Sequence, residues 1–230
     1  MSGKRLAVVQ SSYIPWKGYF DLIRAADEFV LLDDVQFSRG DWRNRNRIKT
    51  PAGAAWLTIP VRTSGRFPQL IQDTLVTDGR WADKHWHALQ ANYARTPFFA
   101  AYAPAIESLY REEAARLSEV NYRFISAICG MLGISTPITW STAYRVPSDR
   151  NRRLIEMCRQ ANATEYLSGP SARSYMDLEA FERAGIRVRF ADYDGYPEYE
   201  QPYPPFDHHV TALDLLFCTG PDAPRYLKAL

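Results

Sequence analysis

Short apolar runs alternate with stretches of helical periodicity along most of the chain. Leu6 to Val9 and Phe29 to Leu32 are four-residue apolar runs, as expected for strands buried on both faces. Between them, Phe20 to Asp27 has apolar residues at helical spacing. Strand, helix and strand within about thirty residues predict a βαβ unit with parallel strands and a right-handed crossover.

The same alternation continues to the end of the chain. The clearest further helix is Leu117 to Leu132, where apolar residues form one stripe and Gly133 provides a stop. We also expect helices over 81–93, 97–111, 151–162, 170–184, 213–217 and 223–230, and strands over 56–61, 138–140, 166–168 and 186–190. This order predicts an α/β fold in three layers, with a mainly parallel twisted sheet and helices on both faces. We expect one domain over residues 1–230, with a helical segment, 81–133, inserted between sheet strands.

Composition places the chain among ordinary globular proteins. Of 230 residues, 46 % are hydrophobic and 23 % are charged, which argues against disorder. The formal net charge is +2, so binding of nucleic acid would need a local basic patch. No apolar window approaches about 20 residues, and Leu6 to Val9 is too short for a signal peptide. We therefore expect a cytoplasmic protein without membrane insertion.

The cysteine and aromatic residues indicate which kinds of site the chain can form. Cys129, Cys158 and Cys218 are far apart in sequence and form no Cys-x-x-Cys pair, so we expect buried reduced thiols. The 14 Tyr, 6 Trp and 15 Pro gather in short runs. Aromatic side chains in proline-rich loops suit a pocket for a flat or sugar-like group, and they also suit ordinary loop anchoring.

Four predicted loops leave the carboxyl ends of predicted strands. They cover residues 10–17, 33–43, 168–174 and 192 onward, and each is rich in polar and aromatic groups. Ligands of parallel α/β sheets bind beyond this edge of the sheet. The convergence of the four loops is the main physical indication of a site.

The first loop places a cation, hydroxyl and amide donors and aromatic rings before a helix. A helix N-terminus attracts anions, and Gly18 permits close approach of the backbone. The alternative is a rigid aromatic turn that caps the sheet. The pattern is neither a Walker loop nor a Gly-x-Gly-x-x-Gly fingerprint. The candidate residues here are Gln10, Tyr13, Trp16, Lys17, Gly18 and Tyr19.

Paired carboxylates, Asp33 and Asp34, follow the second apolar run. They could bind a metal, hold a sugar hydroxyl or accept a proton. The alternative is one turn or helix-cap residue beside one solvated partner.

A basic stretch follows from 43 to 49. If it is extended, Arg43, Arg45, Arg47 and Lys49 share one face, and Asn44, Asn46 and Ile48 share the other. Guanidinium groups suit phosphate or carboxylate ligands. For the whole run, the favoured interpretation is a basic strand face open to solvent. The alternative, in which one or two of these cations reach a ligand anion, stays open.

The later candidates are weaker. Ser168, Gly169 and Ser171 lie between a strand and a helix start, which suits an anion cradle or a plain helix cap. His208 could act as an acid or base, with a surface loop histidine as the alternative. Asp83, His85 and His87 are two apart and do not share a helix face, so we expect no metal site.

These segments together resemble the WbqC-like family over nearly the whole chain. The motifs are Gln10-Ser-Ser-Tyr-Ile-Pro-Trp-Lys-Gly-Tyr-Phe20, Leu32-Asp-Asp-Val-Gln36, Arg43-Asn-Arg-Asn-Arg-Ile-Lys-Thr50, Trp56-Leu-Thr-Ile-Pro60, Tyr166-Leu-Ser-Gly-Pro170, Tyr196-Pro-Glu-Tyr199 and Pro204-Pro-Phe206. The resemblance implies a role in surface-polysaccharide (O-antigen) or specialised-metabolite biosynthesis. It implies modification of an amino sugar or similar amine, for instance by glycyl transfer. Family members often have a histidine where this chain has Val9-Gln10-Ser11.

A second resemblance is to nucleotidylyltransferases and class I synthetases, the HUP-like folds. It rests on the first strand and its loop, on Ala26-Asp27 before the second strand, and on the late serine-rich loop. Their His-x-Gly-His signature is absent. The analogy implies that the chain holds an adenosine-like or nucleotide-sugar group without adenylyl transfer.

The leading hypothesis is an acyl- or aminoacyltransferase acting on an amine or nucleotide-sugar acceptor. Asp33 or Asp34 would accept the amine proton, Lys17 or Arg43 would stabilise negative charge, and Tyr196 would join the ligand-binding set. The donor would be an aminoacyl-tRNA or a carrier-protein thioester. The alternatives are a nucleotide-sugar-binding or scaffold protein of a polysaccharide-assembly complex, and tRNA recognition through the basic stretch. A homodimer is also left open.

Overall fold

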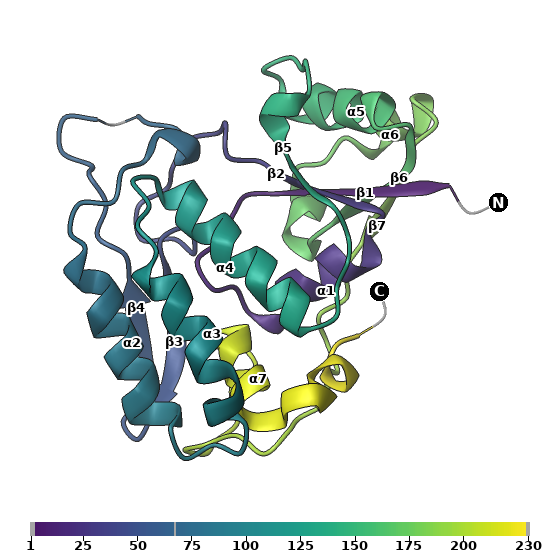
Figure 1. The fold of residues 1–230 in the computed structure, drawn as a ribbon. Helices are drawn as coiled ribbons and strands as arrows, with labels where there is room; N and C mark the ends of the chain where they lie inside the picture. The colour runs from purple at the N-terminus through teal and green to yellow at the C-terminus, as the bar shows by residue number, and fades with distance from the viewer. Residues whose placement is uncertain (1–2, 67, 229–230) are drawn as a thin grey trace.

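The computed structural model describes residues 3–66 and 68–228, in which helices and strands alternate as the sequence predicts (Figure 1). The strands are β1 (Lys4–Val9), β2 (Glu28–Leu31), β3 (Arg45–Thr50), β4 (Gly53–Thr58), β5 (Ile138–Trp140), β6 (Ala163–Ser168) and β7 (Arg187–Phe190). The α-helices are α1 (Lys17–Ala25), α2 (Arg80–Tyr93), α3 (Phe99–Arg111), α4 (Leu117–Met131), α5 (Arg150–Gln160), α6 (Leu178–Arg183) and α7 (Ala212–Thr219). Short 3₁₀ helices are η1 (Ile71–Asp73), η2 (Ser141–Ala143), η3 (Pro170–Ser174) and η4 (Gly220–Tyr226).

Five parallel strands form the main sheet, in the order β5-β2-β1-β6-β7. Counted along the chain within this sheet, the order is 3-2-1-4-5, so the direction of winding reverses between β1 and β6. Leu6 of β1 lies opposite Glu28 on one side and Tyr166 on the other. Such a reversal leaves a crevice outside the carboxyl ends of the two central strands, which is where open α/β sheets bind ligands.

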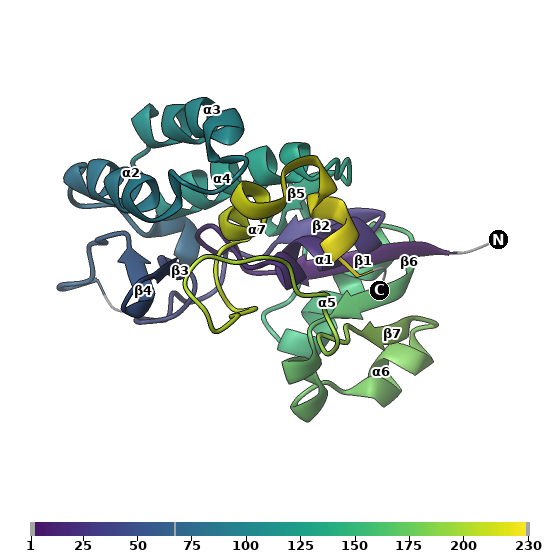
Figure 2. The ribbon, with the colours of Figure 1, turned by 90° about the horizontal axis from the view of Figure 1, so that it is seen from below.

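Apolar side chains alternate between the two faces of the sheet. Ala7, Phe29 and Leu31 pack with α1 and α4 in the larger core, whereas Leu6 and Val8 pack with α5 and α6 in the smaller one. Figure 2 shows α5 and α6 on the side of the sheet opposite α4 and α7. The predicted three-layer α/β fold is therefore confirmed.

A two-stranded antiparallel sheet of β3 and β4 lies outside the main sheet. The strand expected over 56–61 is in fact β4, Gly53–Thr58, which pairs only with β3 and places Arg47 opposite Trp56. This hairpin and helices α2 to α4 all lie between β2 and β5 along the chain. The connection between these two strands of the main sheet thus contains a hairpin before the helices expected over 81–133.

Two expected helices differ in the structure. The helix expected over 170–184 is wrong as one element, because Pro170 begins the 3₁₀ helix η3 and Asp177 then caps a separate α6, accepting from the Ala180 N–H at 3.0 Å. The helix expected over 223–230 is the 3₁₀ helix η4 up to Tyr226, since Pro221 and Pro224 lack the N–H of an α-helical ladder. Residues 229–230 lie outside the described residues.

Two expectations from composition can be compared with the structure. Cys129, Cys158 and Cys218 are free and buried, as predicted. Within residues 3–66 and 68–228, no helix is both long enough and apolar enough to cross a bilayer.

Candidate functional site

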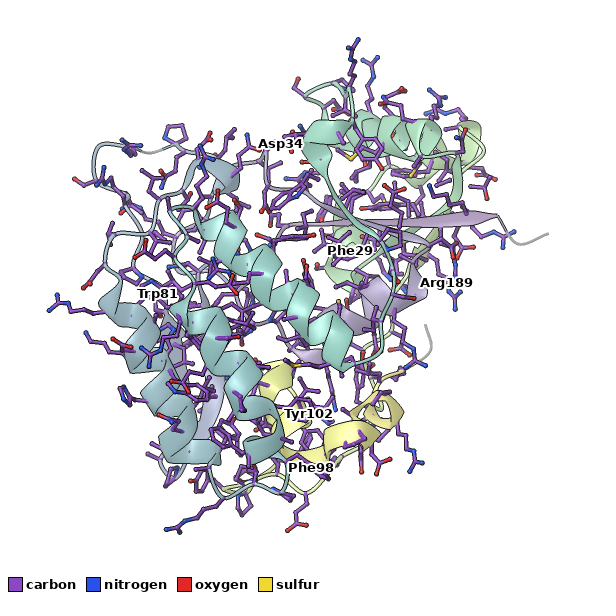
Figure 3. All side chains as sticks on the ribbon, viewed as in Figure 1. Phe29, Asp34, Trp81, Phe98, Tyr102 and Arg189 are labelled. Carbon is purple, nitrogen blue, oxygen red and sulfur yellow. The ribbon has the colours of Figure 1, made fainter. Side chains whose placement is uncertain are left out.

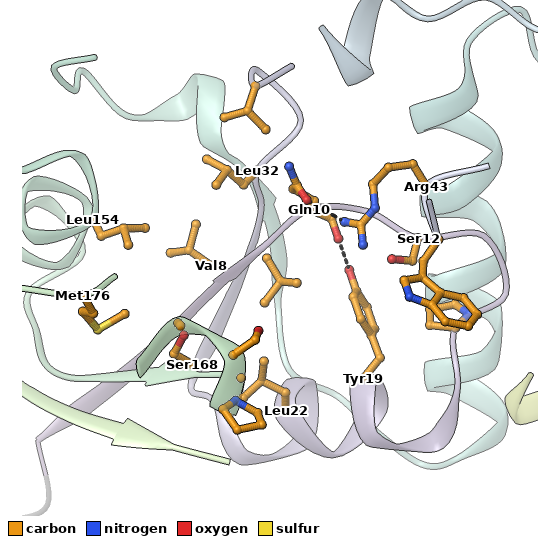
Figure 4. Close-up of a pocket in the computed structure, with 18 of the residues that line it drawn as sticks. Val8, Gln10, Ser12, Tyr19, Leu22, Leu32, Arg43, Leu154, Ser168 and Met176 are labelled. Atoms are coloured by element: carbon orange, nitrogen blue, oxygen red, sulfur yellow. Dashed lines mark hydrogen bonds between the residues drawn. The ribbon is translucent and has the colours of Figure 1, made fainter. Parts of the chain in front are cut away.

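A cavity of about 870 Å³ lies at the carboxyl ends of β1 and β6, where the strand order reverses. All four loops that the sequence analysis placed at this edge contribute to its lining, through Gln10, Trp42, Ser168 and Tyr193 among others. In Figure 4, Gln10, Ser12 and Arg43 gather at one end of the cavity, and Val8, Leu154 and Met176 lie at the other. Apolar side chains therefore gather at the end away from Arg43, where Ser168, Arg150 and Arg153 also contribute to the lining.

Eight of the predicted site residues line this cavity. They are Gln10, Trp16, Tyr19, Arg43, Asn46, Ser168, Gly169 and Ser171. Tyr19 donates to the Gln10 carbonyl at 3.2 Å, and Asn46 donates to the Tyr13 and Ile14 carbonyls at 3.1 and 2.8 Å. These bonds fix the first loop against α1 and β3.

Arg43 is the main cation at the end that carries Gln10 and Ser12. Its side chain is only 10 % exposed, and its Nη1 donates to the Gln10 side-chain oxygen at 3.0 Å. Its Nε is buried without a hydrogen-bond partner among the described residues, and the Asp41 carboxylate lies 4.0 Å away. Asn121 of α4 fixes the Arg43 backbone by donating to its carbonyl at 2.9 Å. A buried guanidinium with an unused donor suits an anionic ligand.

Arginines also come from α5, the helix that follows β5. Arg150 and Arg153 line the cavity, and the Arg150 guanidinium carbon lies 4.6 Å from the Tyr175 ring centroid. Arg153 pairs with Asp34 at 2.5 Å. Among the described residues that line the cavity, three are arginines and none is an aspartate or glutamate. The lining therefore favours a ligand with negative charge.

Trp16 forms an aromatic wall. Its ring stacks on His209 at 5.6 Å and meets Tyr193 edge-on at 4.9 Å, and all three residues line the cavity. A Cβ on Gly18 would lie 2.3 Å from the Trp16 ring, so the missing side chain makes room for the indole. The close approach expected at Gly18 is thus filled by Trp16 of this chain.

Asp33 does not line the cavity. It is 1 % exposed, and its Oδ1 accepts from the Ser11 backbone N–H at 2.8 Å. Burial raises the pKa of this carboxyl above its usual value. Asp33 therefore holds the start of the first loop from behind the cavity.

Asp34 likewise bonds to other residues of this chain and does not line the cavity. It accepts from the Ser141 hydroxyl and pairs with Arg153, each at 2.5 Å. The residue lies on the side of the molecule that carries α5 (Figure 3). Its pairing orients a cavity arginine. Neither carboxylate is among the residues that line the cavity: Asp33 is buried, and the Asp34 side chain is 18 % exposed.

Lys17 lies outside the cavity lining, among aromatic rings of the C-terminal loop. Its Nζ donates to the Pro197 carbonyl at 3.1 Å and lies 4.9 Å from the Tyr196 ring and 5.3 Å from the Tyr199 ring. Burial lowers the pKa of Lys17 to about 8. Tyr196 in turn donates to the Asp21 carboxylate. These residues join the C-terminal loop to α1.

Tyr13, Asn44 and the histidines hold other parts of the fold. Tyr13 is buried against His85 Nδ1 at 2.9 Å, and burial lowers the pKa of His85 to about 4. Asn44 donates to the Ile59 carbonyl at 2.8 Å. His208 is not among the lining residues, whereas its neighbour His209 is, with Nδ1 3.6 Å from the Asp207 carboxylate.

Sequence reasoning missed Arg150, Arg153 and His209. The first two follow β5, a fifth strand end to which the same rule applies. His208 and His209 are both titratable side chains in the same late loop, so the sequence does not distinguish them. The structure shows that His209, and not His208, lines the cavity. Within residues 3–66 and 68–228, no group of three or more His, Cys, Asp or Glu side chains could hold a metal ion.

The arrangement can bind an anionic group at the end near Arg43 and an apolar or flat group at the other. It also offers one exposed histidine, His209, that faces a carboxylate.

Comparison with known proteins agrees with the motifs. The model of the WbqC-like protein family matches residues 10–226. An uncharacterized protein of Mycobacterium tuberculosis, Rv1507c, is 50 % identical over 226 residues, which cover 98 % of each chain. No solved structure matches the fold. The chain belongs to the WbqC-like protein family.

Proposed function

We propose that this protein is an acyl- or aminoacyltransferase whose cavity binds a nucleotide-linked substrate. The acceptor would be an amino sugar or similar amine in surface-polysaccharide or specialised-metabolite biosynthesis. The observation that carries the proposal is the lining of the cavity at the reversal of the strand order, which among the described residues includes three arginines, a set of apolar side chains and no carboxylate. A phosphate would meet Arg43, and a base would fill the apolar end.

The transfer step would use groups already in place. The acceptor amine attacks the carbonyl carbon of an ester or thioester, the C–N bond forms, and the C–O or C–S bond breaks. Arg43 would hold the phosphate and so position the amine at the carbonyl carbon. The amine proton would pass to His209 and from there to the leaving oxygen or sulfur, and Asp207 would orient the ring through Nδ1. We assign the proton to His209 rather than Asp33 or Asp34 because the lining includes only the histidine.

Binding and chemistry are tested in turn. Uridine diphosphate (UDP) at about 100 times its Kd should stabilise the fold by about 2.7 kcal/mol, which raises Tm by about 5–10 °C. Arg43→Gln should reduce this stabilisation to about 0.4–1.4 kcal/mol at the same UDP concentration. Arg187→Gln, which changes an exposed arginine on β7, should keep the full shift.

The second assay supplies UDP-glucosamine with glycine, either as glycyl-tRNA or as a carrier-protein thioester. Mass spectrometry should show one glycyl residue added to the sugar, and His209→Gln should abolish it. No product with either donor, together with no UDP shift, would overturn the proposal.

A nucleotide-sugar-binding protein without chemistry is the second candidate. It is favoured by the engagement of Asp33, Asp34 and Lys17 with partners of this chain rather than with the cavity. A UDP shift without glycyl transfer from either donor would select this candidate.

A further inference from the structure

Two tryptophans form an exposed pair beside the cavity. Trp42 and Trp56 are 40 % and 46 % exposed, and their ring centroids are 5.3 Å apart. Trp42 also lines the cavity, so the pair is continuous with the site. Adjacent exposed indoles are uncommon in a protein with buried cores available to them, and they indicate a binding surface.

Arginines of β3 lie over these rings. The Arg45 guanidinium carbon is 4.2 Å from the Trp56 centroid, and that of Arg47 is 5.8 Å from Trp56 and 5.9 Å from Trp42. Arg47 also donates to the His209 carbonyl at 3.2 Å, which ties the hairpin to the cavity lining. Aromatic faces combined with guanidinium groups suit unpaired bases that stack and phosphates that need cations.

Positive charge is concentrated in the same part of the chain. Residues 35–66 contain seven Lys or Arg and one acidic residue, whereas the whole chain contains 28 and 26. Residues 35–66 are therefore much more basic than the chain as a whole, whose net charge is near neutral. Of these cations, Arg43 and Lys49 are buried, whereas Arg45 and Arg47 lie over the exposed indole pair, where they could meet phosphates.

We propose that the Trp42/Trp56 platform (Trp42, Arg45, Arg47 and Trp56) binds the unpaired end of an RNA strand and directs it into the cavity. The inference rests on the proposed function, since it assigns the acyl donor to an RNA rather than to a carrier protein. Charge alone would suit either partner. The exposed pair of indoles favours RNA, because each base of an unpaired end offers a flat face to stack on an indole.

The test uses the full chain and a fluorescein-labelled RNA hairpin with an unpaired 3′ extension. Anisotropy should show binding that a blunt hairpin of the same stem lacks. Trp56→Ala should weaken binding on the order of 10- to 100-fold, the range that loss of base stacking gives. Arg45→Gln with Arg47→Gln should reduce the slope of log K against log salt by about 1.4. Tyr122→Ala removes another exposed aromatic, on α4, and should change nothing.

A second measurement does not depend on the alanine variants folding well. RNA should quench the intrinsic fluorescence of the wild type, and Trp42→Phe with Trp56→Phe should lose most of this quenching while retaining part of the affinity. Equal binding of the blunt hairpin, unchanged affinity in Trp56→Ala, or binding of an acidic carrier protein instead of RNA would overturn the inference. Trp56 does not line the cavity, so a UDP shift that persists without RNA binding would refute this inference alone.

Discussion

Gly18→Ala tests whether the cavity wall is built as described. Gly18 lies in the first turn of α1, and a Cβ there would lie 2.3, 2.5 and 2.8 Å from three atoms of the Trp16 ring. Carbon atoms do not approach so closely, so the indole would have to move. The ring is held by Tyr193 and His209, which would move with it or lose contact.

The magnitude follows from two opposing effects. Alanine is better than glycine in a helix by about 1 kcal/mol, whereas forcing a methyl group into a filled space costs about 1–3 kcal/mol. We therefore expect Gly18→Ala to lower the free energy of unfolding by up to about 2 kcal/mol. Gly130 is the matched control, because it lies in α4 and a Cβ there would meet nothing within 4 Å. Gly130→Ala should raise stability by up to about 1 kcal/mol.

Urea unfolding followed by circular dichroism measures both variants against the wild type. A displaced Trp16 should also weaken the UDP-induced rise in Tm in Gly18→Ala but not in Gly130→Ala. If Gly18→Ala were as stable as Gly130→Ala, the close contact between Gly18 and Trp16 would be refuted.

Three further predictions concern charged groups. Arg43→Gln should weaken UDP binding about 10- to 100-fold by calorimetry, because a charge-assisted hydrogen bond is lost, and an equal loss in Arg187→Gln would contradict this. Burial raises the pKa of Asp21 to about 6 in the fold, above its unfolded value of 3.8, so the native state binds more protons and the wild type loses stability as pH rises through that window. Asp21→Asn lacks this titration, so its stability relative to wild type should increase by about 2 kcal/mol from pH 4 to pH 7 in urea unfolding, and a constant difference would disprove the assignment. Asp33→Ala leaves the buried Ser11 N–H without its acceptor and should cost about 1–3 kcal/mol of unfolding free energy, whereas an unchanged urea midpoint would show that the bond contributes nothing.

Much of the fold could be predicted because its signals are local. The buried strands β1 and β2 have short apolar runs, and Gly133, with φ of 67°, ends α4 as its place after the apolar stripe indicates. The hairpin was harder, because β4 is mostly exposed and its small residues give no apolar alternation. The single helix expected over 170–184 failed where Asp177 starts a second one, since a cap inside a helical pattern is easily overlooked.

The candidate site was predictable in its location and only partly in its members. The rule that ligands bind beyond strand ends found the loops, and Arg43 and Ser168 with them. It could not give the direction of each side chain. Lys17 and Trp16 are neighbours in sequence, yet Trp16 lines the cavity and Lys17 points into the rings of a loop 180 residues away along the chain. Such partners are set by tertiary packing, which local patterns do not encode.

A crystal structure of the complex with UDP tests the central claim most directly. The nucleotide is expected to lie at the carboxyl ends of β1 and β6, with a phosphate oxygen within hydrogen-bond distance of the Arg43 guanidinium. UDP bound elsewhere on the protein, or bound in the cavity with its phosphates away from Arg43, would contradict it.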